Sequence, residues 1–370
     1  MTRPNGADHD AAQRLLNWYD RNKRDLPWRR HPDPYFTWVS EIMLQQTQVA
    51  TTVPYFEAFV AAFPTFRDLA AAELDQVLSL WSGLGYYRRA RLLHQAARKL
   101  VENDAEIPDT VDDLLLLPGI GPYTAAAIAA IAFGRHVAVL DGNVERVMCR
   151  RLAFADDPKT AAAKRLLAAE TLHLVDPERA GDSNQALMEL GATICRPQSP
   201  DCPGCPLKDG CLGRSSADQL PRPRRRRKTI KVSLSVVVVH RGEDVLLFRR
   251  PENASLLAGM WELPHVVHGP DEAESDLTEL CHALARDYGG RWKVGPVLKR
   301  LKHAVTHRAI TLHVRRGVLE EADTEVRQRP LEAAWVSPER RADFAVSSAV
   351  SKALAAEAVE RSVRKPRKAP

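Results

Sequence analysis

The sequence has no apolar segment long enough to cross a bilayer. Its most apolar helical run, YTAAAIAAIAF, is shorter than the roughly 20 residues that a membrane helix needs. The first residues, MTRPNGADHD, are polar and lack the apolar region of a secretory signal, so we expect a cytoplasmic protein without a membrane partner. Cysteine is also scarce, at six in 370 residues. Because four of the six lie close together in a large chain, a disulfide framework is not expected.

The amino-acid composition is that of an ordinary globular protein with an excess of basic residues. Hydrophobic residues make up 45% of the chain and charged residues 27%, which is typical of soluble domains. A length of 370 residues favours two domains over one core. The net charge of +6 is compatible with a polyanionic partner, although many enzymes without one are equally basic.

The spacing of the apolar residues differs between the two halves of the chain. From residue 10 to about 196, apolar residues recur at intervals of three and four, which predicts an all-α domain. After the basic run RSSADQLPRPRRRRKTI, segments such as VSLSVVVVH predict strands, with a helix at DLTELCHALARDY. We therefore expect four regions: an all-α domain at 1–213, a basic linker at 214–230, an α+β domain at 231–355 and a basic disordered tail at 356–370.

A short loop, residues 195–211, holds four cysteines. They have the spacing C-x6-C-x2-C-x5-C and are Cys195, Cys202, Cys205 and Cys211. Prolines and glycines between them exclude a regular helix or strand, so a bound metal group is the better explanation of the loop. Four thiolates accept either zinc or an iron–sulfur cluster, and the spacing alone leaves both open.

The segment LLLLPGIGPYTAAAI places a tight turn between two helical patterns. Gly119 and Gly121 let backbone N–H groups approach a phosphate, while the start of the next helix faces the same anion. A simple turn between packed helices would look similar, but the string LPGIGP favours a helix-hairpin-helix clamp on the DNA backbone. Asp141, in LDGN, follows shortly after and is either a helix cap or a group in the same groove.

Two further segments carry groups suited to DNA. In VSEIMLQQTQV, Glu41 lies in the first turn of a predicted helix, where the helix dipole favours its charge whatever its role. Gln46 belongs to a polar run that can read base edges or fill a gap in a base stack. In WSGLGYYRRARLL, Tyr86 and Arg88 combine a stacking ring with a phosphate-seeking charge. A solvated basic helix with core aromatics would look much the same.

Together these strings resemble one family. SEIMLQQTQV, WSGLGYY, LPGIGPYTA, LDGNV and NQALMELGA have the order found in helix-hairpin-helix DNA glycosylases with the Gly/Pro-Asp signature, and are most similar to the MutY-type adenine glycosylases. The resemblance covers residues 9–215. It implies that the cysteine loop holds a [4Fe-4S] cluster bound by all four cysteines. It also implies a monomer that acts on double-stranded DNA carrying adenine opposite 8-oxoguanine or guanine.

The resemblance also assigns roles in the chemistry. Glu41 matches the general acid that protonates adenine at N7, and Asp141 matches the carboxylate that stabilises the oxocarbenium ion on the sugar. We expect burial to raise the pKa of Glu41 while Asp141 stays charged. Tyr123 stands where bifunctional relatives have a Schiff-base lysine, and because a phenol forms no imine it predicts a monofunctional glycosylase. Asn143 matches the residue that positions the attacking water.

Roles in recognition follow in the same way. A base inside a duplex must leave the stack before it can be cut, and the family flips it. The resemblance implies that Gln46 and Tyr86 wedge into the space around the opposing base. It further implies that Arg29, in LPWRR, and Gln185, in SNQALMEL, contact the flipped adenine.

The second domain resembles the Nudix-like module that recognises 8-oxoguanine in this family. DLTELCHALARDY lacks the glutamate-rich, magnesium-binding pattern of a working Nudix hydrolase, so nucleotide hydrolysis is not expected. Where the family has Phe-Ser-His, this chain has Val305, Thr306 and His307. Thr306 keeps a hydroxyl for the damaged base, whereas Val305 cannot stack as phenylalanine would. A plain role in a turn between strands is the alternative for Thr306.

Two other functions share parts of this pattern. A glycosylase/lyase for oxidised pyrimidines, of the endonuclease III type, has the same hairpin, aspartate and cysteine loop, but Tyr123 and the second domain argue against it. A non-catalytic protein that binds damaged DNA would use Glu41 and Asp141 only as helix caps.

Overall fold

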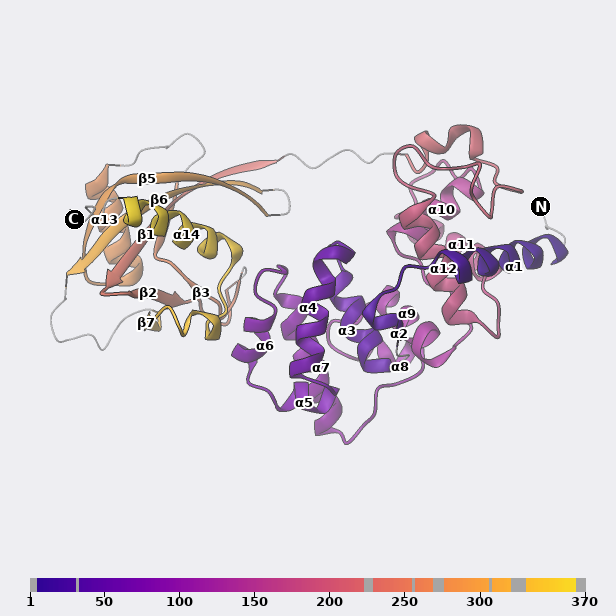
Figure 1. The fold of residues 1–370 in the computed structure, drawn as a ribbon, viewed down its shortest axis with the longest axis horizontal. Coiled ribbons are helices and arrows are strands. Elements are labelled where there is room, and N and C mark those ends of the chain that lie inside the picture. Colours follow the sequence, from indigo (N-terminus) through magenta and orange to yellow (C-terminus); the bar gives the residue numbers. More distant parts are fainter. Residues whose placement is uncertain are drawn as a thin grey trace, which may run out of the picture. The chain divides into compact units, whose positions relative to one another are not determined.

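In the computed structural model of the chain, the described residues are 5–30, 33–222, 229–254, 257–268, 276–305, 308–320 and 331–363. They divide into two compact units (Figure 1). One comprises Met1–Ala72 with Arg89–Arg225 and is helical; the other comprises Glu73–Arg88 with Arg226–Pro370 and contains a sheet. The predicted fold class, an all-α domain followed by an α+β domain, is confirmed.

The helical unit is built from short helices. They are α1 (Asn5–Asn22), α2 (Pro27–Arg30), α3 (Pro34–Leu44), α4 (Val49–Ala62), α5 (Phe66–Ala71), α7 (Arg88–Glu102), α8 (Val111–Leu114), α9 (Pro122–Phe133), α10 (Gly142–Arg151), α11 (Ala161–Leu172), α12 (Ala180–Thr193) and the 3-10 helix η1 (Arg214–Gln219). The short helix α6 (Leu74–Leu80) belongs to the second unit. No helix in the described ranges has both the length and the apolar character that crossing a membrane requires.

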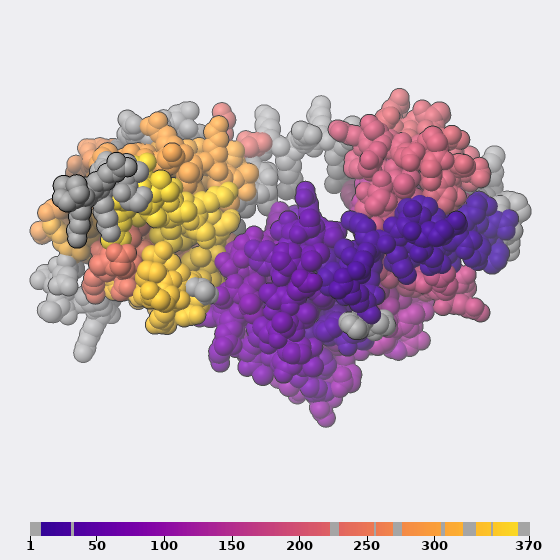
Figure 2. Space-filling model, viewed as in Figure 1, coloured from indigo at the N-terminus to yellow at the C-terminus, as the bar shows by residue number. Residues whose placement is uncertain are grey.

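Helix α9 is the centre of this unit. Its residues from Thr124 to Ala130 are all buried, as expected of a helix that is apolar on every side. It packs against α3 and α12, and α12 in turn packs against α1 and α10. Figure 2 shows α1, in indigo, lying against the pink C-terminal part of the same unit, and buried Leu15 and Tyr19 belong to that contact. Two helices that carry predicted site residues, α3 and α12, thus pack directly on α9.

Local signals in the sequence start the helices that carry the predicted site. Asp33 caps α3 by accepting the backbone N–H groups of Tyr35 and Phe36. Asp141 caps α10 by accepting the N–H of Val144 at 2.6 Å. In α9, Pro122 occupies the first position, where its missing N–H is harmless.

The second unit is a mixed sheet between two helices. Its elements are β1 (Ile230–Arg241), β2 (Asp244–Arg249), β3 (Trp261–Glu262), β4 (His265–His268), α13 (Leu277–Tyr288), β5 (Arg291–Val305), β6 (Arg308–Glu320), β7 (Ala333–Val336), the 3-10 helix η3 (Arg341–Asp343) and α14 (Ser348–Val363). The strand order is β3-β2-β1-β6-β5, with β4 on β1 and β7 on β2. Strands β1 and β6 are parallel, with Val236 opposite Val314.

The run VVVV in β1 is buried on both faces of that sheet. Val236 and Val238 pack with residues of α14, while Val237 and Val239 pack with residues of α13. Such a continuous apolar run is what a strand covered on both sides requires.

The structure differs from the expected regions at two boundaries. The tail predicted to be disordered from residue 356 begins inside α14, which continues to Val363. Its Glu357 is buried and binds His240 and Arg316, and these partners from distant strands are invisible in a local sequence window. Within the expected linker, residues 214–219 form η1, and buried Leu220 accepts a hydrogen bond from Arg150 Nε at 2.9 Å. Residues 223–228 and 364–370 lie outside the described residues.

The hairpin before α9 needs glycine at one of its two glycine positions. Gly119 has a φ of +80°, and a Cβ there would lie 2.6 Å from Cβ of Leu92. Gly121, in contrast, has a φ of −99° and no neighbour within 4 Å of an added Cβ. Only Gly119 is therefore constrained by both backbone and packing.

We predict that Gly119→Ala lowers the free energy of unfolding by about 2 kcal/mol or more, because the left-handed backbone and the clash with Leu92 both oppose a side chain. Gly121→Ala is the matched control; it meets no clash, and as a change at the N-cap of α9 it should cost only about 0.5–1 kcal/mol. Urea denaturation of the two variants measures the difference. Equal stabilities would contradict the packing of the hairpin against Leu92.

Candidate active site

The helical unit contains a cavity of about 180 Å³. Its walls come from α2, α3, α9, α10 and α12, so segments far apart in the sequence meet there. Six residues singled out in the sequence line it: Arg29, Glu41, Tyr123, Asp141, Asn143 and Gln185. The structure therefore brings the predicted acid, the predicted aspartate and the two predicted adenine contacts to one place.

Glu41 is one of the buried acids of this cavity. It lies on α3 and is 5% exposed. The hydroxyl of Tyr123 donates a hydrogen bond to its Oε2 atom. Burial raises the pKa of Glu41 from 4.5 to about 7, helped by the nearby charge of Asp141 and opposed by Tyr123 and Arg29. The expected rise is thus found, and the carboxyl group can carry a proton near neutral pH.

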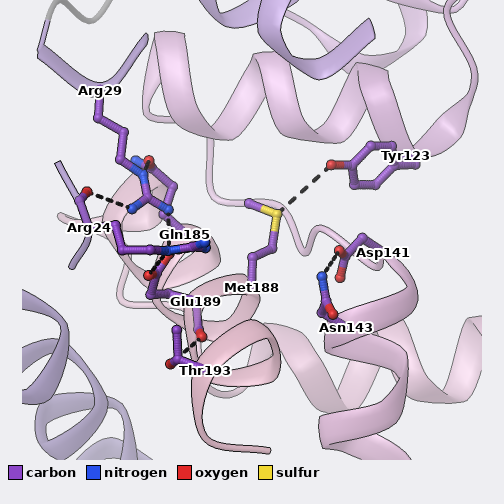
Figure 3. A network of polar contacts seen from close by, with 9 residues as sticks. All are labelled: Arg24, Arg29, Tyr123, Asp141, Asn143, Gln185, Met188, Glu189 and Thr193. Carbon is purple, nitrogen blue, oxygen red and sulfur yellow. Dashed lines mark hydrogen bonds and ion pairs between the residues drawn. The ribbon is translucent and has the colours of Figure 1, made fainter. Parts of the chain in front are cut away.

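Asp141 faces the same cavity with both oxygens bound. Its Oδ1 accepts the N–H of Val144, and its Oδ2 accepts Nδ2 of Asn143 at 2.9 Å (Figure 3). Burial raises the pKa of Asp141, whereas these hydrogen bonds and the charge of Arg146 lower it. The net rise opposes the expectation that Asp141 simply keeps its charge, although its hydrogen-bond donors favour the ionised form.

Tyr123 joins the two sides of the cavity. It is the second residue of α9, and its hydroxyl lies 3.9 Å from Sδ of Met188 (Figure 3). The same hydroxyl forms the bond with Glu41. Burial and the charge of Glu41 hold the pKa of the phenol well above its usual value. Tyr123 therefore stays protonated and donates to the carboxyl group.

A buried ion-pair network forms another wall, and the sequence analysis missed half of it. Glu189 has a fully buried side chain and binds Arg24 at 2.5 Å and Arg29 at 2.9 Å. Arg29 Nε also donates to Gln185 Oε1 at 3.0 Å (Figure 3). Burial opposes the charge of Glu189, but the two arginines together lower its pKa. Its place one helical turn after Gln185 in NQALMELGA is the signal that could have found it.

Arg146 connects the cavity to the cysteine loop. Its Nη2 donates to Oδ1 of Asn143 at 2.9 Å, and its Nε donates to the carbonyl of Cys195 at 2.8 Å. Nη2 also donates to the carbonyl of Gly191 at 2.6 Å. Helices α10 and α12 approach closely here, since a Cβ on Gly191 would lie 2.6 Å from Cβ of Asn143.

The four loop cysteines line one small cavity of about 30 Å³. None of the four forms a disulfide with another described residue. Arg150, only 2% exposed, donates to Sγ of Cys195 at 3.3 Å and to the carbonyls of Arg196 and Pro197, so a cation backs the thiols. Among the residues that the structure describes, no three Cys, His, Asp or Glu side chains are placed to hold a single metal ion. Four cysteines next to a buried guanidinium nevertheless fit an anionic metal cluster, which is larger than a single ion and is bound by one cysteine at each of its metal atoms.

The other predicted residues lie outside the cavity. Gln46 follows α3 and is exposed, and the hairpin glycines do not line the cavity. Tyr86, which is 41% exposed, and Arg88 belong to the second unit. Thr306 and His307 lie outside the described residues.

The buried Glu41 makes stability depend on pH in a defined direction. Because its pKa is higher in the folded state than the ordinary 4.5, the folded chain is stabilised below pH 4.5 and loses this stabilisation as the pH rises to about 7. Glu41→Gln cannot ionise, so at about pH 8 it should be more stable than the wild type by about 2–3 kcal/mol. The difference should vanish near pH 4.5.

Urea denaturation at the two pH values measures this effect. The control is Glu102→Gln, which changes an exposed carboxylate paired with Arg98 on α7 and should show little pH-dependent difference. A Glu41→Gln variant that is less stable than the wild type at both pH values would contradict the burial of an ionisable Glu41.

Comparisons with known proteins show the family of the chain. Residues 39–170 match the HhH-GPD superfamily of base excision DNA repair proteins, and residues 235–356 match the NUDIX domain. The adenine DNA glycosylase of Homo sapiens is 38% identical over 402 residues, covering 91% of this chain and 72% of that protein. That of Schizosaccharomyces pombe is 33% identical over 367 residues, covering 81% of this chain and 80% of that protein.

A solved structure supports the fold of the helical unit. The structure of a thermostable thymine-DNA glycosylase is 27% identical, covers 57% of this chain and 98% of its own, and has a TM-score of 0.53. The identity to the curated relatives extends through both units. From the two matched domains and this identity we conclude that the chain belongs to the adenine DNA glycosylase family.

Proposed function

We propose that the protein is a monofunctional glycosylase that removes adenine mispaired with 8-oxoguanine or guanine in duplex DNA, as a step of base excision repair. One observation carries the proposal: burial raises the pKa of Glu41 to about 7 in a cavity that Asp141 also lines. An acid that can be protonated at neutral pH, next to a second carboxylate, is the pair that glycosidic bond cleavage uses.

The chemistry divides between these two groups. Adenine leaves poorly as an anion, so Glu41 gives its proton to N7 while the bond from C1′ to the base breaks. The electrons of that bond stay with the base, and positive charge builds on the sugar. Asp141 in its ionised form stabilises this oxocarbenium ion. Asn143, which binds Asp141, orients the water that adds to C1′ and leaves an abasic site.

Tyr123 supports a monofunctional reaction. Strand cleavage by a lyase needs an amine that forms an imine with the sugar. The described residues that line the cavity include no lysine, and the position after the hairpin holds Tyr123. Its protonated phenol instead donates to Glu41 and keeps the carboxyl group oriented.

Recognition is shared among several groups. Arg29 and Gln185 contact the flipped adenine, and Arg24 and Glu189 hold Arg29 in place through the ion pairs of the cavity wall. Gly119, Gly121 and Arg88 bind the DNA backbone, and Gln46 and Tyr86 fill the space around the opposing base. These assignments follow the family resemblance. In the Nudix-like domain, Thr306 and His307 read the 8-oxoguanine.

A [4Fe-4S] cluster completes the protein in this proposal. Cys195, Cys202, Cys205 and Cys211 hold it, and Arg150 balances its negative charge. When bound, the cluster ties the loop together and takes no part in hydrolysis. The protein acts as a monomer on its DNA.

Single-turnover excision tests this function. We predict that the chain releases adenine from duplexes with A opposite 8-oxoguanine and A opposite G, and that strand breaks appear only after alkali. Glu41→Gln and Asp141→Asn should slow release by at least about 100-fold, and Glu102→Gln should not. Excision of thymine glycol with spontaneous strand breakage would contradict the proposal, as would full activity of both carboxylate variants.

The same experiment addresses two finer points. The ratio of the rates on the two adenine duplexes shows whether Thr306 suffices for 8-oxoguanine preference when Val305 replaces the phenylalanine of the family. Iron and acid-labile sulfide, measured in the same preparation, should each be present at about four per chain. One equivalent of zinc without sulfide would refute the cluster.

A further inference from the structure

The turn between α3 and α4 has an unusual backbone. Helix α3 ends at Leu44 and α4 starts at Val49, so four residues join two helices that pack against each other. Gln46, at the apex of this turn, has a φ of +60° and is exposed. For a residue with a Cβ, the left-handed conformation costs about 1–2 kcal/mol. Something in the surrounding structure must therefore hold this turn.

Arg89 is the group that binds the turn. It lies on α7 and is only 8% exposed. Its Nη1 donates to the carbonyl oxygens of Ile42 and Met43 at 2.8 Å each and of Gln45 at 2.5 Å. Its Nη2 lies 3.3 Å from Oγ1 of Thr47. One guanidinium thus holds the last turn of α3 and both neighbours of Gln46.

The position of the Arg89 charge shows which helix it stabilises. Arg89 is the second residue of α7, and a cation in the first turn of a helix is unfavourable for that helix. At the carboxyl end of α3, the same cation is favourable and satisfies carbonyls that the helix leaves without partners. Arg89 therefore stabilises α3 and the turn while it opposes the dipole of its own helix.

We infer that Arg89 is a positioning residue that holds Gln46 in its left-handed conformation, so that a rigid turn presents the Gln46 side chain to the base stack. The inference rests on the proposed function, in which Gln46 fills the space around the base opposite the flipped adenine. Because Ile42 directly follows Glu41, the same guanidinium also fixes the end of the helix that carries the acid. Arg89 thus fixes both the turn that carries Gln46 and the end of the helix that carries Glu41.

Lysine cannot replace this arrangement. A guanidinium is planar and presents several donors in a fixed fork, whereas an ammonium is a single charged point on a flexible chain. In Arg89→Lys the charge remains, but the bonds to the two sides of Gln46 cannot all form. Gln46 should then leave the left-handed region in most molecules. Inserting its side chain into the base stack would require the turn to become ordered first, which would slow excision.

A double-mutant cycle on the complete, cluster-bound protein tests the inference. The variants are Arg89→Lys, Gln46→Asn and the two combined, with adenine excision from an A opposite 8-oxoguanine duplex as the readout. Asparagine keeps the amide and enters the left-handed region more readily than glutamine. We expect Arg89→Lys to slow excision about tenfold, and the double variant to stay within about threefold of Gln46→Asn.

The matched control is Arg98→Lys, which changes an exposed arginine of the same helix paired with Glu102. It should leave the rate unchanged. If the role of Arg89 were purely structural, Arg89→Lys would slow excision by the same factor in the wild-type and Gln46→Asn backgrounds. Effects that multiply in this way, or an Arg89→Lys rate equal to the wild type, would overturn the inference.

The same cycle, measured as the free energy of unfolding in urea, needs no substrate. Arg89→Lys should destabilise the chain less when residue 46 is changed to asparagine, so a poorly folded Arg89→Lys variant is itself informative. The two claims can fail separately. If the stabilities of the variants are coupled but the wild-type chain releases no adenine, the link between Arg89 and Gln46 holds, while the proposed function and the role of the turn in DNA binding are overturned. Additive stabilities would overturn that link.

Discussion

The site depends on the burial of one carboxyl group. Glu41 sits on α3 against α9, where Tyr123 donates to it, and burial raises its pKa to about 7. The fold supplies this environment through the close packing of α3 on α9, which is buried from Thr124 to Ala130. An exposed glutamate would be ionised at neutral pH and could not protonate a leaving base. The chemistry thus follows from the packing of two helices.

Arginines organise the rest of the helical unit. Arg24 and Arg29 neutralise the buried Glu189, Arg146 joins Asn143 to the cysteine loop, and Arg150 backs the thiols. Each binds backbone or side-chain oxygens from segments distant in sequence. Buried charges are tolerable only when paired in this way, and their removal one at a time is costly. The basic composition therefore serves internal structure as well as any phosphate contact.

Short sequence motifs predicted much of the fold and of the candidate site. The residues that they missed form pairs with partners far away in the sequence. Glu41, Tyr123 and Asp141 lie in short motifs, and the structure places all three in one cavity. The expected place of Glu41 in the first turn of its helix was wrong, because α3 begins at Pro34 and Glu41 lies near its end. The bond between Arg24 and Glu189 joins residues 165 positions apart, so no window contained it. The same holds for Glu357, whose partners lie on distant strands: residues 356–363 of the predicted disordered tail belong to α14.

The pH dependence of adenine excision tests the central claim most directly. Single-turnover rates on an A opposite 8-oxoguanine duplex would be measured from about pH 6 to about pH 9. Since Glu41 must carry its proton and its pKa is about 7, the rate constant should fall about tenfold per pH unit above that value. Tyr123→Phe should move the fall to higher pH, because the hydroxyl lowers the pKa of Glu41. A rate independent of pH over this range would contradict the account.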